Sequence, residues 1–215
     1  MENPEKVLLS TAFFPPVQYF TKLVSYPQVF IEQHENYNKQ SYRNRCVIYG
    51  ANGPLTLSLP VKKGVTDKIP VREVELDYAT NWPKIHFKAI ESAYRSSPFY
   101  EYYIDAFLPF YNKKHKYLFD YNLDIIHTLL EEIGIKKEIQ LTTEFQPEKH
   151  TKCIDFRNSI SPKKRLRKVD PDFHPATYHQ VFSEKYGFIP NLSILDLLFN
   201  EGPSTKDILE RSCLE

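Results

Sequence analysis

The segment KVLLSTAFFPPVQYFTKLVSYPQVFIEQ, residues 6–33, decides the fold of this chain. Lys6–Ser10 has the apolar pattern of a short buried strand, and Pro16 suits the first turn of a helix over Val17–Val24. Gln28–Gln33 then alternates and is rich in residues with high β propensity, which predicts a second strand. A strand, a helix and a strand in this order form a right-handed crossover, so the two strands are parallel and end at the same edge of a sheet.

A β-hairpin is predicted next along the chain. Arg45–Gly50 and Leu55–Val61 have strand patterns and flank Ala51–Pro54, whose Asn-Gly pair is a strong hairpin signal. Val71–Tyr78 supplies one more predicted strand. The N-terminal half is therefore expected to hold a mixed β-sheet that starts with the β-α-β unit.

The central part of the chain has the period of α-helices. A first helix starts near Asn81 and ends before Pro98. A second, aromatic helix follows it and is expected to be bent or broken near Pro109. A third helix runs from about Tyr117 to Ile133, and the glycine after it suits the end of a helix.

The C-terminal third combines an irregular segment with further helices. Lys137–Thr142 predicts a short strand, whereas Glu144–Thr177 has no sustained period and predicts a long irregular loop. Ser193 and Asp196 resemble a capping box and start a helix that Gly202 stops. We therefore expect an α/β fold, with mixed α+β as the alternative, in a single domain that spans all 215 residues and has a helical C-terminal half.

The composition excludes several classes of protein. Glycine occurs only 6 times, and no glycine pair has the spacing of a Rossmann fingerprint or a P-loop. The 3 cysteines form no C-x-x-C pair, and the chain contains neither G-x-S-x-G nor H-E-x-x-H. His174 and His179, with Cys153 upstream, lack a fourth ligand for a metal site. We therefore predict neither a bound metal nor a cofactor.

The charge balance argues against nucleic acid and membranes as partners. The chain has 28 basic and 27 acidic residues, so its net charge of +1 gives no bulk attraction to nucleic acid. The basic run Lys163–Lys168 lacks interleaved aromatic residues, which favours a solvated loop over an RNA-binding surface. Met1–Ser10 lacks the pattern of a signal peptide, and no apolar run reaches the length of a membrane helix. We expect a cytoplasmic protein with no membrane insertion.

The densest polar segment, QHENYNKQSYRNR at residues 33–45, is the candidate site. It follows the second strand of the β-α-β unit, and the ligands of open sheets bind beyond the carboxyl ends of parallel strands. Arg43 and Arg45 alternate, so both are predicted to face one side and to hold a phosphate or carboxylate. The alternative is a solvent-facing segment before the hairpin, in which the charges pair locally.

Two histidines are candidate acid-base residues. His34 is followed by Glu35, but consecutive strand residues point to opposite faces, which argues against a direct dyad. His86 lies one turn into the first long helix, whose positive end favours an anion, or it packs against Trp82. The catalytic candidates are therefore His34, Glu35 and His86. The substrate-binding candidates are Gln18, Lys39, Gln40, Tyr42, Arg43, Asn44, Arg45, Asn81 and Tyr94.

An ordered series of motifs runs through the chain. The motifs are FFPPVQYF (13–20), HENYNKQSYRNRC (34–46), GANGPLTLSLPV (50–61), NWPKIHFKAIESAYRSSPFYEYY (81–103), LFDYNLDII (118–126) and FIPNLSILDLLFNEGP (188–203). Together they resemble the WbqC-like family of bacterial proteins, over residues 8 to about 203. The family takes its name from a gene of O-antigen clusters, so the resemblance implies a role in the synthesis of bacterial surface polysaccharides. Longer members carry an extra strand-helix segment where this chain has the basic loop before Tyr178.

These observations favour an enzyme, a transferase, that acts on an anionic small molecule. The expected substrate is a phosphate-bearing or nucleotide-activated sugar, with the anion held by Arg43, Arg45 and Lys39. The alternative is a non-catalytic binding or assembly module, in which tyrosines around Tyr102 and the segment Phe188–Pro190 form a partner surface. Homo-oligomerisation is open under both hypotheses.

Overall fold

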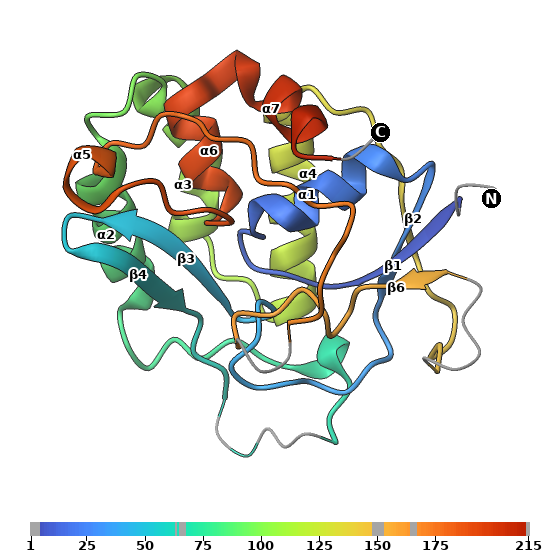
Figure 1. Cartoon of the computed structure of the whole chain (residues 1–215). Coiled ribbons are helices and arrows are strands. Elements are labelled where there is room, and N and C mark those ends of the chain that lie inside the picture. The colour runs from blue at the N-terminus through green and yellow to red at the C-terminus, as the bar shows by residue number, and fades with distance from the viewer. Residues whose placement is uncertain (1–4, 63, 65–67, 148–152, 164–166, 214–215) are drawn as a thin grey trace.

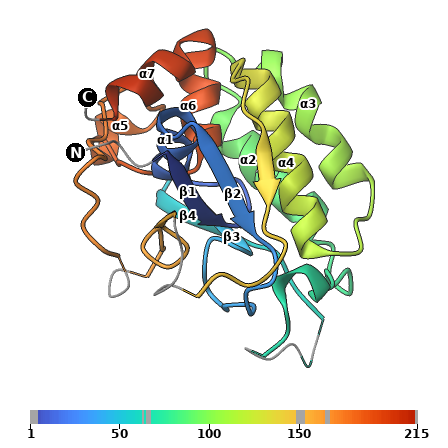
Figure 2. The same ribbon diagram turned by 90° about the vertical axis from the view of Figure 1, so that its right-hand side faces the viewer.

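A four-stranded parallel sheet and a separate two-stranded hairpin form the β-structure, and helices pack on both (Figure 1). The computed structural model describes residues 5–62, 64, 68–147, 153–163 and 167–213. Strand order in the larger sheet is β5-β2-β1-β6. Figure 2 shows α2, α3 and α4 grouped on one side of the molecule and α1, α6 and α7 grouped on another. The α/β class predicted from the sequence is confirmed.

The β-α-β unit at the N-terminus is the centre of the parallel sheet. It consists of β1 (Lys6–Ser10), α1 (Val17–Ser25) and β2 (Gln28–Glu32). The two strands pair in parallel from Lys6 opposite Gln28 to Ser10 opposite Glu32. Most of their residues are buried, because α1 returns the chain across the sheet and covers it. The last residues of both strands are polar and lie side by side, at the edge where the candidate site was predicted.

The two outer strands come from the second half of the chain. β5 (Ile139–Leu141) pairs with β2, and β6 (Ile154–Asp155) pairs with β1, both in parallel. The sequence predicted a strand near β5 but none at β6. A strand of two residues shows no periodic pattern, so β6 could not be recognised from the sequence without knowledge of its pairing with β1. The larger sheet is wholly parallel, and the mixed sheet that we expected does not form.

The predicted hairpin is present as a sheet of its own. β3 (Arg45–Gly50) and β4 (Gly53–Ser58) pair antiparallel, with Gly50 opposite Gly53 at the turn. The strand predicted at Val71–Tyr78 is wrong. This segment begins with a 3-10 helix, Val71–Glu73, and then makes only isolated bridges. The buried residues Val71 and Val74 are three apart, a spacing that suits a helical turn as well as a strand.

Three helices follow in the order that the sequence predicted. They are α2 (Trp82–Tyr94), α3 (Tyr100–Asn112) and α4 (Leu118–Ile133). Pro109 lies inside α3 without breaking it, since the carbonyl of Pro109 accepts from the amide of Lys113 at 3.0 Å. After α4 the chain turns at Gly134, whose φ of 73° is the left-handed conformation expected there. Among the described residues, no helix is long and apolar enough to cross a membrane.

The C-terminal helices pack against the first helix and the aromatic helices. They are α5 (Ser183–Tyr186), α6 (Ile194–Glu201) and α7 (Thr205–Arg211), with a 3-10 turn at Gly202–Ser204. The Ser193 hydroxyl accepts from the amide of Leu195, which confirms the predicted N-cap of α6. Two features require glycine at position 202. Its φ of 50° is left-handed, and a Cβ there would lie 2.5 Å from the ring of Phe99.

The irregular segment between β6 and α5 is attached by a buried ion pair. The ammonium of Lys22 on α1 lies 2.9 Å from Asp170 Oδ1, and both side chains are almost fully buried. Gln18 also donates to the other oxygen of Asp170, at 2.8 Å. This loop is therefore fixed to α1.

Candidate functional site

A cavity of about 420 Å³ opens beyond the carboxyl ends of the parallel strands. Its lining comes mainly from the segments that directly follow β2, β5 and β6. The lining residues are His34, Glu35, Asn36, Asn38, Arg43, Phe145, Arg157 and Asn158. This is the place where open parallel sheets bind their ligands. We call it the sheet-edge cavity.

A buried arginine–carboxylate pair forms one wall of the sheet-edge cavity. Arg43 donates from Nε to Glu35 Oε1 at 2.9 Å and from Nη2 to Oε2. Nη2 also donates to the hydroxyl of Ser10 at 2.6 Å, at the end of β1. Both charged side chains are buried, so the bidentate hydrogen bonds and the contact with Ser10 are needed to offset the loss of hydration. This pair fixes the polar segment on the last residue of the first strand.

A second buried arginine also lines the sheet-edge cavity. Arg157 donates to both oxygens of Asp155, and its Nη1 lies 3.3 Å from Glu32 Oε2. Burial alone would lower the pKa of Arg157, but the hydrogen bonds and charges of Asp155, with the charges of the nearby glutamates, raise it above the ordinary value. The guanidinium stays charged and lies 5.5 Å from the centre of the Phe145 ring.

Glu32, the last residue of β2, joins three segments around the sheet-edge cavity. Its side chain is fully buried. Oε1 accepts from the amide of His34 at 2.8 Å and from the hydroxyl of Thr142 at 2.7 Å. Oε2 accepts from the amide of Gln146 at 2.9 Å and from Arg157. A buried carboxylate with this many donors holds the segments after β2, β5 and β6 in one arrangement.

The same arrangement fixes the proton on His34. The ring nitrogen Nε2 lies 3.1 Å from the carbonyl oxygen of Thr142. A carbonyl oxygen only accepts, so in the neutral ring Nε2 carries the proton and Nδ1 carries the lone pair. His34 is half-buried and lines the cavity. It can therefore accept a proton from a bound hydroxyl group.

The charges around the sheet-edge cavity are almost completely paired. Glu32, Glu35 and Asp155 face two guanidinium groups, and each carboxylate accepts at least one of their N–H groups. Within the described part of the chain, Nη1 of Arg43 is left without an acceptor. The cavity thus offers the Nη1 amino group of Arg43, the amides of Asn36 and Asn38, and an imidazole. These groups suit a ligand rich in hydroxyls better than one of high charge.

The structure brings three of the predicted residues together. His34, Glu35 and Arg43 line the same cavity. The sequence argued against a direct His34–Glu35 dyad from the alternation of strand residues, but β2 ends at Glu32 and the chain bends directly after it. The alternation of a strand therefore does not apply to them.

The other predicted residues of the polar segment lie around the cavity, not in its lining. Asn44 donates to the carbonyl of Leu59 at 3.1 Å, and Arg45 is the first residue of β3. Lys39 and Gln40 are exposed. Tyr42 is buried and lines a neighbouring space of about 10 Å³ that also borders Arg43 and Arg157.

Four predicted residues lie elsewhere in the fold. Gln18 binds Asp170, and the hydroxyl of Tyr94 accepts from the amide of Tyr49 at 3.0 Å. His86 is buried against Trp82, at 5.2 Å between ring centres, and burial lowers its pKa to about 4. His86 is therefore neutral at pH 7, and it packs against Trp82, which was the alternative to a role in anion binding. Asn81 lines a different cavity.

The sequence missed several residues that build the sheet-edge cavity. Ser10 and Glu32 carried a signal, since each is a polar residue at the end of an apolar strand predicted to reach the ligand-binding edge. Asp155 and Arg157 carried none, because the strand that places them has only two residues. Thr142 could not be found either, since its role depends on contacts with residues about 110 positions away.

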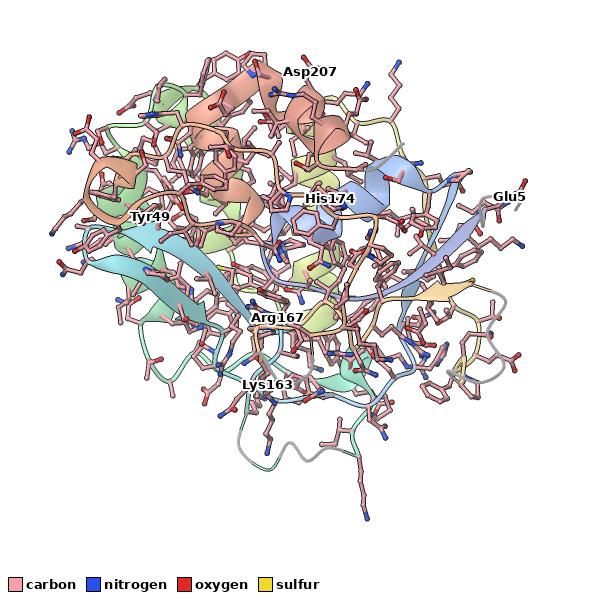
Figure 3. The ribbon with its side chains drawn as sticks, viewed as in Figure 1. Glu5, Tyr49, Lys163, Arg167, His174 and Asp207 are labelled. Carbon is pink, nitrogen blue, oxygen red and sulfur yellow. The ribbon has the colours of Figure 1, made fainter. Side chains whose placement is uncertain are left out.

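The described residues hold no group of three or more side chains that could ligate a metal. The ring of His174 lies 2.9 Å from the carbonyl oxygen of Pro171, and His179 is exposed. The centre of the basic run, residues 164–166, lies outside the described residues. Lys163 and Arg167, labelled in Figure 3, donate to backbone carbonyls of Lys39 and Ser161.

Comparison with known proteins gives one family and one relative. The model of the WbqC-like protein family matches residues 11–169 and 162–208. The protein Rv1507c of Mycobacterium tuberculosis is 23% identical over 227 residues, which cover 94% of this chain and 96% of the relative. No solved structure matches. The residues matched by the family model include α1, β2 and every lining residue of the sheet-edge cavity.

Proposed function

The chain belongs to the WbqC-like protein family, and from this membership and the sheet-edge cavity we propose that the protein is a transferase of bacterial surface-polysaccharide synthesis. Its substrate is a sugar that carries a phosphate or a nucleotide. The sugar ring occupies the sheet-edge cavity. The family supplies the biological context, and the cavity supplies the chemistry.

The observation that carries the proposal is the set of groups around this cavity. A histidine with a lone pair on Nδ1, a carboxylate and two asparagines surround about 420 Å³ at the ligand-binding edge of a parallel sheet. Amides and carboxylates satisfy the donors and acceptors of sugar hydroxyls. The ring of Phe145, half exposed beside Arg157, offers a flat apolar surface for a sugar face.

Each side chain has one role in this proposal. His34 accepts the proton of the acceptor hydroxyl as its oxygen attacks the activated sugar carbon, and the phosphate-bearing group leaves. Asn36 and Asn38 orient the sugar hydroxyls. Arg43 Nη1 meets one oxygen of the leaving phosphate, while Glu35 holds the guanidinium in position.

Thermal unfolding with a panel of nucleotide sugars and sugar phosphates tests the proposal. We expect at least one compound to raise the Tm of the wild-type protein, by about 5–10 °C at a concentration near 100 times its Kd. The variant Asn38→Ala is expected to lose most of this shift. His34→Gln is expected to keep the shift and to lose transfer, measured as release of the nucleotide or phosphate.

The exposed His127 on α4 supplies the matched control. His127→Gln is expected to behave as the wild type in both measurements. If no compound of the panel stabilises the wild-type protein, or if Asn38→Ala keeps the full shift, the sheet-edge cavity is not the sugar site.

The second candidate function, an assembly module, depends on exposed aromatic residues. Tyr102 on α3 is 76% exposed, whereas Tyr100 and Tyr103 are each 4% exposed and belong to the core. The expected partner surface on this helix is thus reduced to one tyrosine. Light scattering of the wild type and Tyr102→Ser over a range of concentrations tests it. A wild-type protein that stays monomeric and copurifies with no partner excludes this function.

A further inference from the structure

A second cavity, of about 580 Å³, lies where α2 begins and α3 ends. Its lining residues are Tyr78, Ala79, Thr80, Asn81, Pro83, Lys84, Phe87, Leu108, Tyr111, Asn112, Lys113 and Lys114. None of them lines the sheet-edge cavity. We call it the lysine cavity.

The lysine cavity has a positive rim without a counter-charge. Lys84, Lys113 and Lys114 are exposed, and the lining contains no carboxylate. Within the described residues, none of the three ammonium groups is in an ion pair. Lys114 lies over the ring of Tyr78, at 5.3 Å from its centre. Three unpaired cations around one cavity create a local potential that attracts anions.

The position of Lys84 adds to the positive potential of the lysine cavity. Lys84 lies in the first turn of α2, where the helix dipole is positive and a cation is unfavourable. That turn contains no acidic residue, and the side chain of Asn81 makes no capping hydrogen bond. The positive end of α2 and the ammonium group of Lys84 therefore add to each other at the cavity. An anion would compensate both.

The wall of the lysine cavity is apolar and aromatic. Phe87 and Tyr111 pack edge to face, at 5.7 Å between ring centres, and Leu108 and Pro83 complete this side. Tyr78 is held in place because its hydroxyl donates to the carbonyl of His115 and accepts from its amide. A ligand that fits has a flat apolar part against this wall and a compact anionic part at the lysines.

We propose that the lysine cavity binds a nucleoside diphosphate or triphosphate, with the base against Phe87 and Tyr111 and the phosphates at Lys84, Lys113 and Lys114. A nucleotide has both parts: a planar base that can pack against the aromatic wall, and a phosphate group with several negative charges that can pair with the lysines. The site is separate from the sheet-edge cavity, so its test does not depend on transferase activity.

Isothermal titration calorimetry of the wild-type protein with uridine and adenosine diphosphates, pyrophosphate and uridine tests the site. We expect a diphosphate nucleotide to bind, more weakly at 200 mM than at 50 mM salt because phosphate contacts are screened. Lys84→Ser and the double variant Lys113→Ser/Lys114→Ser are expected to lose at least tenfold in affinity. Asn38→Ala, in the sheet-edge cavity, is expected to leave this affinity unchanged.

Lys88 is the matched control, since it is exposed on the same helix one turn later and does not line the cavity. Lys88→Ser is expected to change the affinity less than twofold. The proposal is overturned if neither nucleotide binds, if Lys88→Ser weakens binding as much as Lys84→Ser, or if pyrophosphate binds as tightly as the nucleotides. Loss of nucleotide binding in Asn38→Ala alone would assign the nucleotide to the sheet-edge cavity.

Discussion

The sheet-edge cavity and the lysine cavity use positive charge in opposite ways. At the sheet edge, two buried arginines are held by carboxylates, so their charge serves mainly to fix the walls. Where α2 begins and α3 ends, three exposed lysines have no carboxylate partner among the described residues, and their charge faces solvent. The count of basic residues in a segment therefore says little about anion binding. What matters is which charges the fold has already neutralised.

This difference also explains why the arginine pair predicted from the sequence does not form an open anion site. The sequence pointed to Arg43 and Arg45 because arginine forks match phosphate. In the fold, Glu35 takes up most of the Arg43 fork, and Arg45 does not line the cavity. A buried arginine cannot remain without a carboxylate, because an isolated buried charge is costly. An exposed lysine can remain unpaired, because water solvates it.

The largest effect is expected from Arg43→Met in the sheet-edge cavity. The substitution leaves Glu35 buried without its guanidinium partner, which should lower the free energy of unfolding by about 3–5 kcal/mol. Urea denaturation at pH 7 measures it. The double variant Arg43→Met/Glu35→Met should regain most of this loss, since both charges are then absent. Equal losses in the single and double variants would show that the unpaired carboxylate is not the cause.

Asp196 on α6 differs from the carboxylates of the sheet-edge cavity, because neutral donors hold this buried carboxyl group. Tyr178 and Gln180 donate to its Oδ2 at 2.7 and 2.8 Å. Burial raises the pKa of Asp196 from 3.8 to about 6, although these hydrogen bonds and the charge of His179 oppose the rise. The folded protein then binds a proton more tightly than the unfolded chain does. This contribution to stability is complete below pH 4 and is lost between pH 4 and pH 6.

The expected loss across this interval is about 3 kcal/mol, since one unit of pKa corresponds to about 1.4 kcal/mol. Asp196→Asn cannot titrate. The stability of this variant relative to the wild type should therefore rise from pH 4 to pH 6 and stay level above it. Urea denaturation of both proteins at several pH values measures the difference. A difference independent of pH would mean that Asp196 titrates at its ordinary value.

Thr142→Val should have an intermediate effect. Valine has nearly the same shape but removes a hydroxyl that donates to the fully buried Glu32. We expect a loss of about 2 kcal/mol in the free energy of unfolding, because a buried carboxylate loses one of its donors. Thr143→Val, at an exposed neighbour, is the control and should change stability by less than about 0.5 kcal/mol. Equal effects of the two variants would place Thr142 outside the network that supports His34.

The smallest effect is expected in the lysine cavity. Lys113→Met removes an exposed ammonium group with no ion-pair partner among the described residues, so stability should change by less than about 0.5 kcal/mol. Thermal unfolding in the absence of nucleotide measures it. A loss comparable to that of Arg43→Met would mean that this lysine supports the fold, and the contrast between the two cavities would fail.

Much of the fold could be predicted because its signals are local. The apolar run of β1, the alternation in β2, the Asn-Gly turn of the hairpin and the helical period of α2 and α4 are each contained within a short segment. The errors occurred where the local signal was weak or ambiguous. The pattern of Val71–Tyr78 predicts a strand, but this segment begins with a 3-10 turn, and β6 lies within the segment predicted to be an irregular loop.

The candidate site was predictable in location but only partly in composition. The polar segment after β2 pointed to the correct edge of the sheet, and His34, Glu35 and Arg43 do line a cavity there. His86 is a candidate from the sequence because it lies one turn into a helix whose positive end favours an anion, but in the fold the alternative applies and it packs against Trp82. Arg157 comes from a segment more than a hundred residues later in the chain, and nothing near it in the sequence indicated its position.

The helices, the strands and the sheet edge at which β1 and β2 end follow from local patterns in the sequence. The period of apolar residues, the turn residues and the caps act over a few positions, so they can be read without knowledge of the fold. Which charges are paired depends on contacts that form only in the folded chain. Glu32, Glu35, Arg43, Asp155 and Arg157 come together from segments far apart, and burial forces each to find a partner. The lysines at the start of α2 and the end of α3 need no such partner, because they are exposed and water solvates their charge.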